Sequence, residues 1–161
     1  MAVDYFLKID GIPGESMDHK HKDEIMLESF SWGETNTGSA AHGAGMGAGK
    51  VTMQDFNFVM KVNKASPKLF LACANGQHIK QAILTCRKAG KDQQEYMKVT
   101  FSDVMVSSFQ TGGSGAADVI PLDQISLNFS KVEMEYKEQK ADGTLGGTIK
   151  AHFDLKQMKG G

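Results

Sequence analysis

The chain has 161 residues, of which 40% are hydrophobic and 23% charged, and its formal net charge is -1. These values are typical of a soluble globular protein, and a chain of this length can bury one core but not two full domains. We therefore expect a single domain over residues 1–161.

The distribution of charged and apolar residues excludes several functions. Arg87 is the only arginine among 18 basic residues, which 19 acidic residues balance. Duplex binding needs a clustered basic face, so nucleic acid is not an expected partner.

The longest apolar run, residues 69–74, is far shorter than the roughly 20 residues of a membrane-spanning helix. We expect no membrane anchor, and the first residues have no signal-peptide pattern, so the protein should be cytoplasmic when synthesised.

Alternation of apolar and polar residues predicts strands along most of the chain. It is clearest in residues 3–9 and 149–155, and each of these strands should bury one face. Further strands are predicted at residues 25–32, 51–62, 78–88, 96–109 and 125–136. Seven or eight short strands predict a mainly β fold, either a sandwich or a barrel.

The alternation reverses within residues 125–136. The apolar residues Ile125, Leu127 and Phe129 are in phase, whereas Val132, Met134 and Tyr136 have the opposite parity. A shift of one residue turns the other face of a strand toward the core. A β-bulge or a strand passing from one sheet to another would explain the reversal, as would burial of both faces.

One segment, residues 66–76, has the pattern of a short helix instead. Ser66 is a candidate N-cap, and Pro67 suits the first helical position because the amide hydrogen that it lacks would be unpaired there. Asn75 and Gly76 favour a left-handed stop at the other end. We expect a single helix beside an otherwise β structure.

The glycine-rich segment of residues 38–50 does not match a nucleotide-binding loop. A phosphate-binding loop needs glycine five positions before Gly49, where this chain has Ala44. Val51 also follows Lys50, where serine or threonine would bind magnesium. The segment is better interpreted as a long loop that becomes ordered on another molecule.

No other motif predicts an active site, a cofactor site or a metal site. His19 and His21 lack further ligands at a suitable spacing, and the mixed charges of residues 18–24 predict a solvated loop. Glu133 and Glu135 alternate with apolar residues on a strand, which favours a solvated or interface face over a catalytic pair. The two cysteines, Cys73 and Cys86, are expected to be reduced and buried. We therefore expect a protein that is not an enzyme and has no cofactor.

Several segments, in their order and spacing, closely resemble the haemolysin-coregulated protein (Hcp) family of bacterial type VI secretion. They are residues 6–16, Ser31-Trp32-Gly33, residues 72–76, residues 87–90 and residues 127–136. The resemblance implies two β-sheets that form a small barrel-like body with one short flanking helix, similar to phage tail-tube proteins. It also implies a homohexameric ring, and stacked rings that form the inner tube of a contractile secretion machine.

The resemblance further implies partners and a route out of the cell. The lumen of the tube would carry effector proteins, and the tube would contact the spike and sheath proteins of the apparatus. The protein itself would be exported through the apparatus without a signal peptide. The glycine-rich segment lies where the family has its long extended loop, which would contact neighbouring subunits and the next ring. The resemblance assigns these contacts to Gly38, His42, Gly45, Met46, Gly49 and Lys50.

Two further sets of residues follow from the strand patterns. A ring closes through a head-to-tail interface, so each subunit presents two different patches. Val132, Met134 and Tyr136 are the candidates for one patch. On the predicted strand at residues 25–32, Phe30 and Trp32 should face the core. The opposite face, with Leu27, Ser29 and Ser31, should then face the lumen and its effectors.

Two other function classes fit the sequence less well. A β-sandwich of this composition could be a carbohydrate-binding module or a lectin, but such sites usually display aromatic side chains. Here aromatic residues total 8%, and Trp32, the single tryptophan, lies in phase with a predicted core face. A hydrolase is disfavoured because no nucleophile is accompanied by a base and an orienting group.

Overall fold

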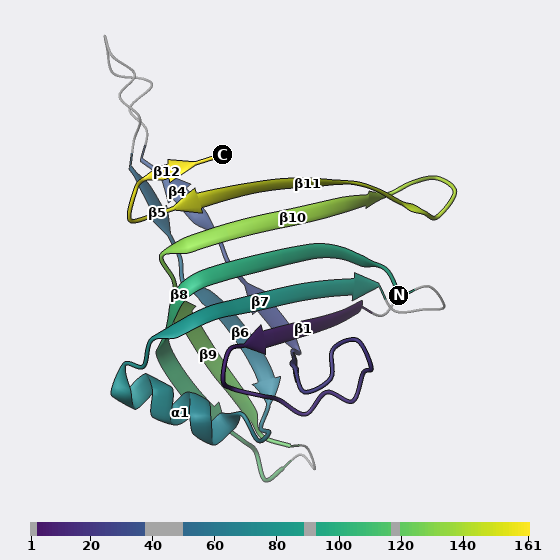
Figure 1. Cartoon of the computed structure of the whole chain (residues 1–161). Coiled ribbons are helices and arrows are strands. Elements are labelled where there is room, and N and C mark those ends of the chain that lie inside the picture. The colour runs from purple at the N-terminus through teal and green to yellow at the C-terminus, as the bar shows by residue number, and fades with distance from the viewer. Residues whose placement is uncertain (1–2, 38–49, 89–92, 117–119) are drawn as a thin grey trace.

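The computed structural model describes residues 3–37, 50–88, 93–116 and 120–161, which form twelve strands and one helix (Figure 1). The strands are β1 (Val3–Ile9), β2 (Ile25–Met26), β3 (Ser29–Ser31), β4 (Glu34–Asn36), β5 (Val51–Met53), β6 (Phe56–Lys61), β7 (Ile79–Lys88), β8 (Glu95–Gly112), β9 (Leu122–Asn128), β10 (Lys131–Gln139), β11 (Leu145–Asp154) and β12 (Lys159–Gly160). The helix α1 spans Ser66–Asn75. The mainly β fold with one short helix confirms the predicted fold class.

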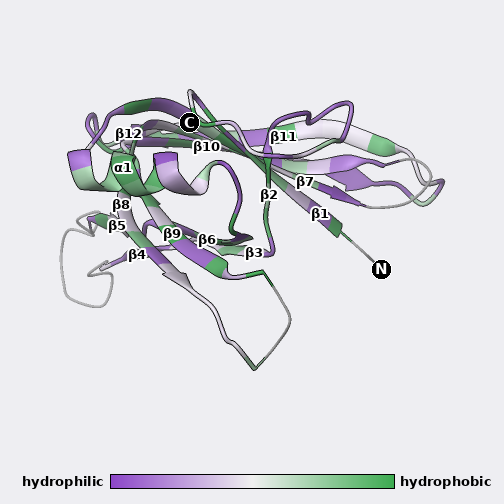
Figure 2. Ribbon diagram, turned by 90° about the horizontal axis from the view of Figure 1, so that it is seen from below, coloured by the Kyte–Doolittle hydropathy of each residue, from purple (hydrophilic) through white to green (hydrophobic). Residues whose placement is uncertain are grey.

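The strands form two layers that share β8. The larger sheet has the order β12-β11-β10-β8-β7-β1-β2, and the second layer has the order β3-β6-β9-β8. The pairs within both are antiparallel, and β4 and β5 form a separate hairpin. Figure 2 shows the layers edge-on, with part of the larger sheet extending beyond the second layer.

The long strand β8 passes between the layers because it bends at Asp103. Val104 still pairs with Ile79 of the larger sheet, whereas Met105 pairs with Asn128 of the second layer. Asp103 has a left-handed backbone conformation (φ 53°), which an aspartate tolerates better than most residues. Its carboxylate accepts hydrogen bonds from Ser130, His78 and Lys156, and these bonds lower its pKa to about 2. The bend is thus fixed by a cluster of side chains at one corner of the molecule.

The parity reversal in residues 125–136 is the second passage between layers. The predicted strand is in fact two strands, β9 in the second layer and β10 in the larger sheet. They meet at Phe129 and Ser130, where the Ser130 amide donates to the Ser102 carbonyl. Of the three explanations for the reversal, the change of sheet is the one observed.

The predicted strand at residues 25–32 is likewise divided between the layers. The Leu27 amide donates to the Tyr5 carbonyl in the larger sheet, and the Glu28 amide donates to the Val59 carbonyl in the second layer. Leu27 therefore does not share an outward face with Ser29 and Ser31. Its side chain is only 9% exposed and belongs to the core, which contradicts the predicted lumen position.

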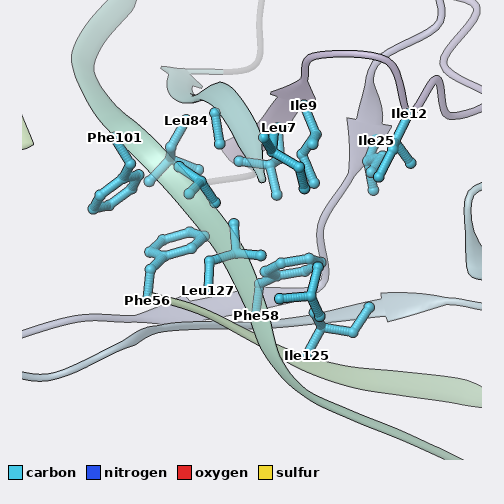
Figure 3. Packing of buried hydrophobic residues seen from close by; sticks show 14 of the residues in the cluster. Leu7, Ile9, Ile12, Ile25, Phe56, Phe58, Leu84, Phe101, Ile125 and Leu127 are labelled. Atoms are coloured by element: carbon cyan, nitrogen blue, oxygen red, sulfur yellow. The ribbon is translucent and has the colours of Figure 1, made fainter. Parts of the chain in front are cut away.

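The core lies between the two layers (Figure 3). Phe56, Phe58 and Met60 are buried in phase on β6, as the alternation predicts, but Val62, after the strand ends, is 38% exposed. Phe101 from β8 packs against Phe56 and Phe129, with ring centroids 4.8 and 4.7 Å apart. Side chains of both layers point toward each other in Figure 3.

The helix α1 begins and ends almost as predicted, but its N-cap differs. Pro67 lies in the first turn, and Gly76 is left-handed (φ 62°) at the C-terminal end. The N-cap residue is Ala65 and makes no side-chain capping bond, so the assignment of Ser66 was wrong. The Ser66 hydroxyl instead donates to Asp123 Oδ2 over 2.5 Å, which ties the start of the helix to β9.

The charged segment at residues 18–24 is docked on the larger sheet, which corrects the prediction of a solvated loop. Arg87, only 3% exposed, donates from Nη2 to Asp18 (2.8 Å) and Asp4 (3.0 Å). The His21 ring stacks on Phe6 at 4.4 Å between centroids. Its two ring nitrogens lie 3.0 Å from the Glu24 carboxylate and 2.5 Å from the Glu95 carboxylate. Phe6 is therefore buried on the face of β1 that the alternation predicted to be polar.

Candidate functional site: the uncovered part of the larger sheet

An apolar row on β10 and β11 is not covered by the second layer. Tyr136 is directly opposite Ile149, and Met134 is opposite Ala151, so the four side chains lie on the same face of the sheet. Met134 is 39% exposed, Tyr136 46% and Ile149 69%, and Ala151 is also exposed. We call Met134, Tyr136, Ile149 and Ala151 the uncovered face. Contiguous exposed apolar residues of this kind mark interaction sites.

The strand pattern explains why this row is apolar. The next strand of the sheet is β8, where Met97 pairs with Tyr136 and Val99 pairs with Met134. These residues extend the apolar face of β10 toward the core. The apolar face predicted for β11 is present, but the prediction that it is buried is wrong for the single chain, where Ile149 and Ala151 are exposed. Of the three predicted interface residues, Met134 and Tyr136 are accessible. Val132 is not, because it is 4% exposed and belongs to the core.

A hollow of about 520 Å³ lies beside the uncovered face. It is lined by residues after β3 and by residues of β4, β5, β10 and β11, namely Trp32, Gly33, Glu34, Met53, Val132, Met134, Ala151, His152 and Phe153. The Trp32 indole Nε1 is buried and has no hydrogen-bond partner among the described residues. The mainly apolar lining of the hollow can accept an apolar side chain.

The outer face of the second layer has a different chemistry. A shallow hollow of about 300 Å³ lies across its four strands, where the polar lining residues Ser29, Ser31, Asn57, Ser108, Gln110 and Gln124 carry no charge. Ser29 and Ser31 are exposed there, as predicted for residues that face away from the core. A surface of hydroxyl and amide groups can hydrogen-bond varied molecules without attracting one sign of charge.

Comparisons with known proteins show which family the chain resembles. The family described as "Type VI secretion system effector, Hcp" matches residues 6–136. The chain is also 45% identical to Protein hcp1 of Pseudomonas aeruginosa over 159 residues, which are 98% of both chains.

This chain belongs to the Hcp family of type VI secretion.

Solved structures support the same assignment. Hcp1 from Salmonella typhimurium is 41% identical, with a TM-score of 0.82 and 99% of both chains covered. A further type six secretion system protein is 30% identical, has a TM-score of 0.93 and is matched over 99% of this chain and 100% of that one. The resemblance noted in the sequence is confirmed, and family membership connects the chain with type VI secretion.

The predicted loop of the Hcp-family chain is mostly outside the structure. Gly38, His42, Gly45, Met46 and Gly49 lie outside the described residues, and Lys50 is exposed just before β5. Within the described part of the chain, no helix is long and apolar enough to cross a membrane.

The described side chains form no arrangement typical of a hydrolase. At the Asp103 corner, the carboxylate lies between the Ser130 hydroxyl and the His78 ring, so the histidine does not face the serine that it would have to activate. Among the described residues, no three His, Cys, Asp or Glu side chains are grouped to hold a metal. Burial raises the pKa of the Cys86 thiol to about 12, which keeps it protonated and unreactive. The other cysteine, Cys73, is half-buried and also free.

Proposed function

We propose that this Hcp-family chain is a structural subunit of the type VI secretion inner tube. Six copies form a ring, the rings stack into a tube, and the tube is exported and carries effector proteins in its lumen. This role requires no catalysis, cofactor, nucleic acid or membrane anchor. Its partners are further copies of the chain, effectors, and the spike and sheath proteins.

The observation that carries the proposal is the uncovered face. The larger sheet continues past the second layer with an apolar row, Met134, Tyr136 and Ile149, that remains exposed in a single copy. A head-to-tail ring would cover this row with a different surface of the neighbouring subunit. Burying exposed apolar area in this way is the main favourable contribution to such an association.

The hollow beside the uncovered face supports the same contact. A neighbouring subunit would insert an apolar side chain there. In this arrangement Ser29 and Ser31, on the second layer, face the lumen and contact effectors. The loop of residues 38–50 contacts the next ring.

Native mass spectrometry and negative-stain electron microscopy of the purified full chain test the proposal. We expect a six-membered ring for the unaltered protein. Ile149→Glu and Tyr136→Glu should leave a folded monomer, because both side chains are exposed in the single copy. The matched control is Thr148→Glu, which introduces the same charge on the opposite face of β11 and should retain the ring. A monomeric unaltered protein, or an intact ring in both variants, would overturn the proposal.

A further inference from the structure

The outer edge of β11 lacks a strand partner along much of its length. One side of β11 pairs with β10 from Leu145 to Asp154. On the other side, β12 pairs only at its end, Phe153 with Gly160 and Asp154 with Lys159 (Figure 1). Within the described ranges, no further strand pairs with this side. An edge of this kind is a template for an added strand.

The backbone groups at this edge can be identified from one hydrogen-bonded pair. The His152 amide donates to the Gly161 carbonyl (2.9 Å), and the Gly161 amide donates to the His152 carbonyl (3.0 Å). Backbone direction alternates along a strand, so Lys150 and Thr148 direct their amide and carbonyl groups to the same side as His152. Both residues are exposed, and none of the described residues bonds to these groups. The open edge therefore presents two donors and two acceptors in the register of a strand.

The chain shows that this edge accepts a strand at close range. The segment Lys159–Gly161 occupies its far end, and Gly160 lies so near that a Cβ there would be 2.5 Å from the His152 carbonyl oxygen and 2.8 Å from the Phe153 ring. The added segment is short, and the adjoining part of the edge from Thr148 to Lys150 stays open.

The native neighbour of β11 indicates which side chains such a strand would carry. On β10, Glu135 is opposite Lys150 and Tyr136 is opposite Ile149, so acidic and apolar residues alternate. The Lys150 ammonium also lies 4.0 Å from the Glu133 carboxylate. A strand on the open edge meets the same two rows of β11, one with Lys150 and one with Ile149. Acidic side chains complement the first row, and apolar side chains extend the second.

We propose that the open edge of β11, from Thr148 to Lys150, binds an extended segment of a partner protein in which acidic and apolar residues alternate. Backbone hydrogen bonds hold the segment, and the two side-chain rows select its sequence, as in other cases of β-strand addition. The proposal concerns an edge of the sheet and does not depend on ring formation.

A labelled synthetic peptide with the sequence of residues 131–140 serves as the probe, because it contains the alternating pattern of β10. Its binding to the full chain is measured by fluorescence anisotropy. Thr148→Pro removes one outward donor and should weaken binding at least tenfold, since proline at an edge position has no amide hydrogen. The control Thr148→Ala keeps the donor and should bind within twofold of the unaltered chain. Far-ultraviolet circular dichroism checks that both variants are folded.

A second measurement does not depend on folding of the proline variant. Two further peptides are N-methylated, one at its odd-numbered and the other at its even-numbered residues. Only the peptide whose methyl groups replace the amide hydrogens that point toward β11 should lose affinity. A peptide with lysine in place of its glutamates should also bind more weakly, because it would face Lys150. These results together would support the proposal.

Three results would overturn it. One is the absence of saturable binding by the unmodified peptide. Another is equal binding by the Thr148→Pro and Thr148→Ala chains, together with equal affinities of all methylated peptides. The third is pairing of whole chains that rises with protein concentration, that Thr148→Pro abolishes and that the peptide does not inhibit. In that case a second copy of the chain would occupy the open edge. A missing ring in the preceding experiment would affect none of these results.

Discussion

Truncation of Phe101 tests whether the contact between the layers is the main source of stability. This side chain is fully buried, and its ring lies 4.8 Å from Phe56, 4.7 Å from Phe129 and 6.0 Å from Trp32. Phe56 comes from the second layer, Phe129 from the junction of β9 and β10, and Trp32 from the segment after β3. Phe101→Ala therefore leaves a cavity at the centre of the contact.

The expected loss of unfolding free energy for Phe101→Ala is about 3–5 kcal/mol, the usual range for a buried phenylalanine. For a protein of this size, that loss lowers Tm by about 6–20 °C. The matched control is Phe70→Ala on α1, where the side chain is 57% exposed. Its ring contacts Phe109 at 6.1 Å between centroids, so this control should cost about 0.5–1.5 kcal/mol, well below the loss at Phe101.

Urea unfolding followed by tryptophan fluorescence measures both variants. It is repeated over a tenfold range of protein concentration, because association would add to the apparent stability. A loss at Phe101 that is no larger than the loss at Phe70 would refute the assignment of the core. A loss that appears only at high concentration would show that Phe101 acts through assembly.

Three further predictions concern the docked loop and the outer face of the second layer. The hydrogen bond from Arg87 holds the pKa of Asp18 well below its ordinary value, so Asp18→Asn should cost about 1.5–3 kcal/mol at pH 7. A carboxylate whose pKa is lowered by folding stabilises the folded state above its pKa in the unfolded chain, about 3.8 here. Urea unfolding at several pH values should therefore show the difference in unfolding free energy between the two proteins shrinking as the pH falls below 3.8. Gly14→Ala should lower Tm in a thermal melt, because a Cβ there would lie 2.6 Å from the Glu24 carbonyl oxygen. In capped tubes, Ser31→Cys should react with a small thiol reagent but not with a bulky one, because residue 31 is proposed to face the lumen. Equal labelling by both reagents would place residue 31 on an outer surface.

Alternation predicted those strands that stay within one layer. For β1 and β7 the observed bounds are close to the predicted ranges, although both strands carry buried residues on both faces. The predicted strand at residues 51–62 is divided into β5 and β6, which belong to different sheets. The parity reversal in residues 125–136 was also informative, since a change of buried face has few structural causes. Helix α1 was found from Pro67 and Gly76, whose backbone preferences are local.

The errors occurred where distant residues decide the structure. The prediction for Leu27 is wrong because alternation assumes one continuous strand over residues 25–32. The chain instead leaves the larger sheet after β2, which has two residues, and enters the second layer at β3. The loop at residues 18–24 was expected to be solvated because its partners, Arg87 and Glu95, are about seventy residues away in the sequence. No local signal shows that a charged segment has a buried counter-ion.

The uncovered face and the open edge have one common cause, the different extents of the two layers. Strands of the second layer run across those of the larger sheet (Figure 1). The six residues of β6 span about 20 Å, which corresponds to about four strand spacings of roughly 4.8 Å. The larger sheet has seven strands in sequence from β12 to β2, so the second half of β10 and most of β11 extend past the second layer. Their apolar row is then left for another subunit, and β11, as the last long strand, keeps an edge that its own short β12 closes only in part.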